Sequence, residues 1–160
     1  MILLKIFDIK STMADLLLKE EFDQFYLEEA KVVTFAKLEL SGIRNMNFYD
    51  SAEKETGLSE RICWKEAKPV IYSYIKGKKT PSSFRITLRA PESIAAGILE
   101  KGGRQGMAEY LLHFRFESEE LSVVTGCSYH AFTMEKAEEF AWDQAVKEYF
   151  KRRKISFEEA

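Results

Sequence analysis

The stretch SFRITLRAPESIAAGILEK, residues 83–101, predicts a strand that leads directly into a helix. Phe84, Ile86 and Leu88 alternate with polar residues, which is the two-residue period of a strand with one buried face. Pro91 follows where the helix would begin, and proline suits a first turn because its fixed φ is helical and its missing N–H is not needed there. We infer the rest of the fold from this strand and helix.

The same order of elements is expected earlier and later in the chain. Residues 2–7 predict a short buried strand, and Ser11 is a candidate N-cap of a helix with an apolar face. Two strands rich in aromatic and β-branched residues should follow at 25–33 and 35–43. Downstream, residues 108–126 predict two alternating strands around an acidic turn at 117–120.

Two further segments, 69–76 and 128–133, are candidate third strands, so the chain is expected to hold two β-α-β-β-β-like halves. The half-repeats would span 1–76 and 84–133, and a shift of 82 positions places Leu4 on Ile86 and Leu17 on Leu99. The alternative is two unrelated halves that match by chance. A C-terminal amphipathic helix is expected at 134–154. Its buried face would hold Trp142, Ala145, Val146 and Tyr149, and its polar face Glu138, Glu139, Asp143 and Lys147. Residues 1–160 are thus expected to form a single α+β domain.

Composition narrows the class of protein. The 160 residues are 46% hydrophobic and 31% charged, the balance of a globular chain, and the formal net charge of -2 argues against a general nucleic-acid binder. Cys63 and Cys127 are the only cysteines, no apolar stretch approaches about 20 residues, and the N-terminal apolar run is too short for a signal peptide. We expect a soluble, cytoplasmic protein.

No residue is assigned to catalysis, to a cofactor or to a metal. Cys127 and His130 are three positions apart in an expected strand, so their side chains should point to opposite faces. His113 is expected to be a half-exposed strand residue, and no close ligand pair such as C-x-x-C is present. Whether Cys127, His113 and His130 converge in space is left open.

The basic segment that precedes residue 83 has two interpretations. Lys76, Lys78 and Lys79 are expected on a solvated turn between strands 69–76 and 83–89, since a single glycine that leads into a strand is not a phosphate-binding loop. The alternative is a nucleic-acid contact that uses these lysines with Arg85 and Arg89, aided by the basic cluster 151–154. That cluster would also complement the negative end of the C-terminal helix dipole.

Residues 43–68 lack a clear apolar period and are too long for an ordinary connection. Asp50 and Glu53 have the spacing of a capping box, and Arg44, Asn45, Tyr49 and Trp64 are the candidate contact site for a partner. Anchoring of this segment to the core is the other interpretation of its aromatic residues. The leading functional hypothesis is a non-catalytic binding or scaffold module that recognises a protein or peptide partner, or that self-associates.

The phrases LLKIFDIKSTMADLL, FDQFYLEEAKVVTF and TGCSYHAFTMEKAEEFAWDQAVK resemble a family of uncharacterised bacterial proteins of about this length, a domain of unknown function. This resemblance covers almost the whole chain and implies no reaction or catalytic residue. Two β-α-β-β-β units in tandem are also similar to one domain of the sliding-clamp fold, in which helices face encircled DNA. Acidic and basic residues balance on both expected helices here, so a clamp-like fold would not imply that function.

Overall fold

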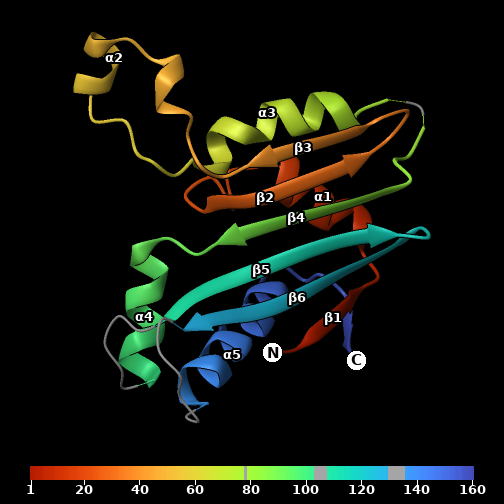
Figure 1. The fold of residues 1–160 in the computed structure, drawn as a ribbon. Helices are drawn as coiled ribbons and strands as arrows, with labels where there is room; N and C mark the ends of the chain where they lie inside the picture. Colours follow the sequence, from red (N-terminus) through yellow and green to blue (C-terminus); the bar gives the residue numbers. More distant parts are fainter. Residues whose placement is uncertain (78, 103–107, 130–135) are drawn as a thin grey trace.

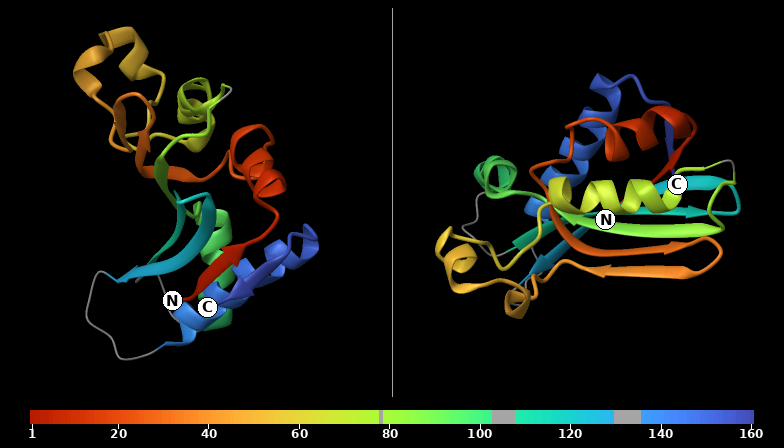
Figure 2. Two further views of the ribbon diagram at one scale, coloured as in Figure 1. Left: turned by 90° about the vertical axis from the view of Figure 1, so that its right-hand side faces the viewer. Right: turned by 90° about the horizontal axis from the view of Figure 1, so that it is seen from above.

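A computed structural model of the chain describes residues 1–77, 79–102, 108–129 and 136–160, and it belongs to the α+β class. An antiparallel sheet of seven strands forms one layer, and α1, α3 and α5 pack together over one of its faces (Figures 1 and 2). The predicted fold class is confirmed. None of the helices in the described ranges is long and apolar enough to cross a bilayer.

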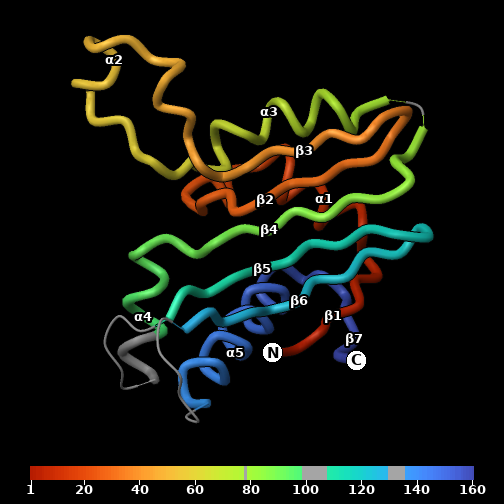
Figure 3. Tube along the Cα trace, viewed as in Figure 1, coloured from red at the N-terminus to blue at the C-terminus, as the bar shows by residue number. Residues whose placement is uncertain are grey.

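The elements follow one another in the order β1 (Leu3–Ile6), α1 (Ile9–Leu17), β2 (Tyr26–Val33), β3 (Lys37–Ser41), η1 (Met46–Phe48), α2 (Ser51–Glu55), α3 (Trp64–Ile75), β4 (Ser83–Arg89), α4 (Glu92–Gly102), β5 (Ala108–Glu117), β6 (Glu120–Tyr129), α5 (Ala137–Arg152) and β7 (Phe157–Glu159). The strands lie in the order β3-β2-β4-β5-β6-β1-β7. The short β7, for which no strand was predicted, pairs with β1 at the edge of the sheet (Figure 3).

The order strand, helix, strand, strand occurs twice, as β1-α1-β2-β3 and as β4-α4-β5-β6. Pairing differs between the two occurrences, because β4 lies beside β5 whereas β1 lies between β6 and β7. The equivalence of the two halves and the likeness to a clamp domain are therefore not confirmed. Residues 130–133 of the second candidate third strand lie outside the described residues.

The first candidate third strand, residues 69–76, is wrong, because this segment belongs to α3. Trp64, Ala67 and Ile71 are the buried residues of α3, and their spacing of three and four is that of a helical face. The side chain of Glu66 accepts a hydrogen bond from the Cys63 N–H, which caps the helix. The helix thus begins upstream of Pro69, in a segment for which no element was predicted. The hairpin expected between 69–76 and 83–89 is also wrong, because a connection joins the helix α3 to the strand β4.

Asp8, and not Ser11, caps α1, since its carboxylate accepts a hydrogen bond from the Ser11 N–H at 3.2 Å. The capping box of Asp50 and Glu53 is confirmed: the Asp50 carboxylate accepts from the Glu53 N–H at 2.7 Å, and the Glu53 carboxylate from the Asp50 N–H at 3.2 Å. It opens α2, which lies in the segment that projects from the end of the sheet (Figure 1).

The core lies between the sheet and the helices. The apolar sheet residues of this core are Leu4, Ile6, Leu27, Ala30, Val32, Phe84, Ile86, Leu88, Tyr110, Leu112, Phe114, Phe116, Leu121 and Val123. Trp142 and Val146 of α5 are buried as predicted, but Glu138 and Asp143, which were placed on the polar face, are buried too. Each has a partner from the sheet: the Tyr110 hydroxyl donates to Glu138 at 3.0 Å, and the Thr125 hydroxyl donates to Asp143 at 2.5 Å. Such bonds offset part of the cost of removing these carboxylates from water, although Oε1 of Glu138 has no hydrogen-bond partner among the described residues.

Candidate functional site

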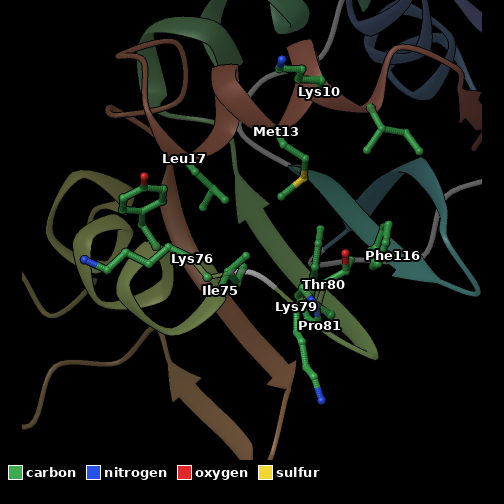
Figure 4. Close-up of a pocket in the computed structure, with 13 residues that line it drawn as sticks. Lys10, Met13, Leu17, Ile75, Lys76, Lys79, Thr80, Pro81 and Phe116 are labelled. Atoms are coloured by element: carbon green, nitrogen blue, oxygen red, sulfur yellow. The ribbon is translucent and has the colours of Figure 1, made fainter.

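A cleft with a volume of about 780 Å³ opens on the helical side of the sheet (Figure 4). It lies between α1, the last turn of α3 and the connection from α3 to β4. The size of the cleft is that of a ligand-binding cavity.

The walls of the cleft are apolar. Met13 and Leu17 stand one turn apart on α1, and Ile75 faces them from α3 (Figure 4). The floor contains Phe84 and Phe116, which are cross-strand partners with stacked rings whose centroids lie 5.4 Å apart. The sheet thus supplies a rigid base on which the two helices stand apart.

The connection from α3 to β4 closes one end of the cleft. Gly77 has a φ of 147°, a conformation that side chains with a Cβ rarely adopt, so glycine is required at this change of direction. Pro81 is buried against the cleft, and the next N–H, that of Ser82, donates to the Val33 carbonyl at 2.9 Å. The connection is therefore tied to the end of β2.

Three lysines surround the opening: Lys10, Lys76 and Lys79 (Figure 4). None has an ion-pair partner among the described residues, and no described carboxylate lines the cleft. The ammonium of Lys76 lies 6.0 Å from the centre of the Tyr72 ring. Lys10 lies in the first turn of α1, where the positive end of the helix dipole disfavours a cation.

These side chains offer apolar contact inside the cleft and positive charge around it. Such an arrangement suits an apolar group that carries negative charge at its margin. Sequence reasoning did not identify Lys10, Met13 and Leu17 as site residues. The available signal was the lack of an acidic residue in the first turn of α1, where Lys10 places a positive charge at the positive end of the helix dipole.

The residues predicted to contact a partner do not form one exposed surface. Arg44 is only 9% exposed, and its guanidinium binds both carboxylate oxygens of Glu66, at 3.0 and 2.7 Å. It also donates to the Tyr49 hydroxyl at 3.0 Å and to the Ser59 carbonyl at 2.6 Å. These hydrogen bonds with Glu66 raise the pKa of Arg44 and lower the pKa of Glu66. Arg44 and Tyr49 therefore attach the projecting segment to α3.

The other two predicted contact residues have local structural partners. Asn45 caps η1, because its side-chain oxygen accepts a hydrogen bond from the Asn47 N–H at 3.2 Å. Trp64 is fully buried, and its indole N–H donates to the Leu16 carbonyl at 2.7 Å. Trp64 thus joins α3 to α1, which is the anchoring role considered as the alternative above.

The residues predicted to contact phosphate are separated in space. Lys76 and Lys79 line the cleft on the helical side, Lys78 lies outside the described residues, and Arg85 is exposed on the opposite face of the sheet. Arg89 is enclosed by Glu109 at 2.6 Å and Glu28 at 3.5 Å, and its guanidinium lies over the ring of Tyr26.

The C-terminal basic cluster 151–154 has a local role at one of its members. Arg153 forms a two-pronged ion pair with Asp15, at 3.0 and 2.7 Å, and a longer contact with Glu21 at 3.4 Å. Burial favours the neutral form of Asp15, but the hydrogen bonds and charge of Arg153 outweigh it and lower the Asp15 pKa. This contact ties the end of α5 to α1.

His113 and Cys127 point to opposite faces of the sheet, and His130 lies outside the described residues. His113 contacts the Thr87 hydroxyl at 3.0 Å, and burial together with the charge of Arg115 lowers its pKa. Burial raises the pKa of the Cys127 thiol to about 12. Within the described ranges, no three His, Cys, Asp or Glu side chains are grouped so that they could hold a metal ion.

Comparison with known proteins places the chain in a family without assigning it an activity. The model of a "Family of unknown function (DUF5721)" matches residues 15–158, which is most of the chain. The chain gives no significant match to a curated protein or to a solved structure.

Proposed function

The chain belongs to this family of unknown function, and from the geometry of its cleft we propose that it binds a protein partner. The bound part of the partner would be an apolar segment that also carries acidic residues. The observation that carries the proposal is the apolar cleft surrounded by three lysines without a described carboxylate partner. Recognition of an amphipathic helix in an apolar groove is a recurring mode of protein binding. Acidic residues on the partner would complement Lys10, Lys76 and Lys79.

A protein segment is favoured over a small amphiphilic molecule because an exposed aromatic side chain also lies outside the cleft, near the end of α3. On another side of the last turn of α3, Phe35 is 96% exposed at the tip of the β2–β3 hairpin. Its ring centroid lies 6.3 Å from that of Tyr74, whose hydroxyl donates to the Ala36 carbonyl and so holds the tip against α3. Exposed apolar side chains beside a groove are typical of protein interaction surfaces.

A display selection of helical peptides on the full chain tests this proposal. We expect enriched peptides with apolar residues three or four positions apart and with flanking Asp or Glu. A synthetic enriched peptide should bind at least tenfold more weakly to the triple variant Lys10→Glu, Lys76→Glu, Lys79→Glu. It should bind within twofold of wild type to the charge-matched control Lys54→Glu, Lys65→Glu, Lys151→Glu, whose three positions are exposed and away from the cleft.

Three outcomes would overturn the proposal. Equal binding of the peptide to the cleft variant and the control variant would place the site elsewhere. Failure to enrich any peptide, with binding of dodecanoate instead, would show that the cleft takes a small amphiphile. A dimer in sedimentation experiments that the cleft variant abolishes would make a second copy of the chain the occupant. A cytoplasmic location and a scaffold role stay predictions.

A further inference from the structure

One face of the sheet lies opposite α1, α3 and α5 (Figure 2). The strand registers place a row of basic residues on that face, and the cleft does not include them. Lys31 on β2 is in register with Arg85 on β4, which is in register with Arg115 on β5. The row continues through Ser122 on β6 to Lys5 on β1. Adjacent strands are about 4.8 Å apart, so the four intervals from Lys31 to Lys5 span roughly 19 Å.

The two arginines at the middle of this row lack neutralising partners. Lys31 is paired with Glu29 at 3.0 Å, and Lys5 is paired with Glu120 at 3.0 Å. Arg85 and Arg115 are both exposed, and neither has an ion pair or hydrogen-bonded partner among the described residues. Like charges directly opposite each other on adjacent strands destabilise a sheet, so this pair costs stability that a counter-anion would recover.

Shallow hollows lie along the same row. One of about 240 Å³ is bordered by Lys31 and Arg85, a second of about 110 Å³ by Arg85 and Arg115, and a third of about 300 Å³ by Arg115 and Lys5. Each arginine therefore borders two neighbouring hollows. The three hollows follow the row from β2 to β1.

The chemistry of the row favours phosphate groups. A guanidinium binds phosphate oxygens through two parallel hydrogen bonds, and lysine adds a point charge. Phe84 and Phe116 border the second hollow, but their side chains are buried on the helical side, so they offer no ring on which a base could stack. Recognition here would depend on phosphate and not on base identity.

We propose that the row Lys31, Arg85, Arg115 and Lys5 binds a chain of linked phosphates that lies across the strands. Single-stranded nucleic acid and inorganic polyphosphate share this chemistry. Acidic Glu39 on β3 and Glu158 on β7 are in register with the two ends of the row. Lys37 also borders the first hollow, but it is paired with Glu39 at 2.8 Å. The site is on the opposite side of the sheet from the cleft, so this proposal does not depend on the proposed function.

Fluorescence anisotropy in 50 mM NaCl tests the site with two labelled probes: an oligothymidylate of about 15 nucleotides, near the largest site size of small single-strand binders, and inorganic polyphosphate. Unlabelled polyphosphate also serves as a competitor of the labelled oligonucleotide. We expect the wild-type chain to bind the oligonucleotide, with displacement by polyphosphate. The double variant Arg85→Gln, Arg115→Gln should bind at least tenfold more weakly. Its slope of log K against log salt should fall by roughly 1.4, the value for two lost phosphate contacts.

Further variants separate a defined site from general charge. The control Lys65→Gln, Lys151→Gln removes the same charge from exposed positions outside the row and should bind within twofold of wild type. Glu117 borders the second and third hollows, so Glu117→Gln should strengthen binding by two- to threefold. Arg85→Lys with Arg115→Lys keeps the charge but loses the two-pronged geometry, and its affinity should fall between those of wild type and the glutamine variant.

The melting temperature of the double glutamine variant should equal or exceed that of wild type, since a like-charge pair is removed. Weaker binding could then not be attributed to unfolding. Displacement of the oligonucleotide by polyphosphate supports the shared site, and binding of only one probe assigns the site to that source. Absence of binding by both probes, or equal losses in the control and the double glutamine variant, would overturn the proposal.

Discussion

Replacement of Trp64 by phenylalanine tests whether this residue anchors α3 to α1. Its side chain is fully buried, and its indole N–H donates to the Leu16 carbonyl at 2.7 Å. Leu16 lies in the last turn of α1, where a carbonyl has no partner within the helix. Trp64→Phe removes the donor and part of the ring while it keeps an aromatic side chain.

The expected cost has two parts. A buried carbonyl without a partner costs about 1–3 kcal/mol. The smaller ring leaves a cavity, and since full truncation of a buried aromatic to alanine costs about 3–5 kcal/mol, the partial truncation should cost about 1 kcal/mol. The free energy of unfolding should therefore fall by about 2–4 kcal/mol, and the melting temperature of a chain of this size by roughly 4–16 °C.

Urea denaturation followed by circular dichroism measures the change. Trp142→Phe is the matched control, because the Trp142 ring is also buried whereas the bond that its indole N–H donates to the Leu111 carbonyl, at 3.0 Å, is only partly buried. Water can replace that bond, so the loss should be smaller in the control. A Trp64→Phe protein that unfolds within about 0.5 kcal/mol of wild type, a range usual for surface substitutions, would refute the anchoring role.

Three further predictions follow from single residues. Lys10→Glu should raise the melting temperature, because a negative charge is favourable in the first turn of α1, and it should weaken the binding of a cleft peptide. A fall in both the melting temperature and the peptide affinity would contradict the assignment of Lys10 to the site. Asp15→Asn should lower the urea midpoint at pH 7, because a carboxyl with a lowered pKa stabilises the fold while it is ionised. The difference in midpoint from wild type should disappear as the pH falls through the range near 4 and below. A difference that persists at pH 2 would exclude the ion pair with Arg153 as its cause. Cys127 in the folded protein should react with a disulfide reagent at pH 8 far more slowly than Cys127 in the chain unfolded by urea. A pKa of about 12 leaves roughly one thiol in ten thousand as thiolate at this pH. Equal reaction rates would show that the thiol is not buried.

Local patterns in the sequence determined several elements of this fold. The alternation of Phe84, Ile86 and Leu88 predicts β4, and the segment around the acidic turn predicts the hairpin of β5 and β6. Trp142 and Val146 at helical spacing predict α5, and Asp50 with Glu53 predicts the capping box of α2. Each of these signals depends on residues that are close in the chain, so it could be recognised without knowledge of the packing.

Tertiary contacts decided α3. The alternating residues after Pro69 favour a strand, but the helix is held by Trp64, Ala67 and Ile71, which are buried in the core. The burial of Glu138 and Asp143 has the same kind of cause, since their partners Tyr110 and Thr125 come from the sheet and not from α5. Periodicity reports which face of a segment is apolar, whereas the partners of a buried polar group depend on distant segments.

The two candidate sites also depend on packing. Lys10 and Lys76 are far apart in the sequence, and they border one cleft because α1 and α3 stand side by side on the sheet. Arg85 and Arg115 form a pair only through the register of β4 and β5, and Lys5 joins their row because β1 pairs with β6. Sequence alone identified these residues as charged and placed Arg85 opposite the buried face of its strand, but it did not predict the helix that precedes Lys76. The register of non-local strands, set by burial of the opposite face, decided which of these charges lie together.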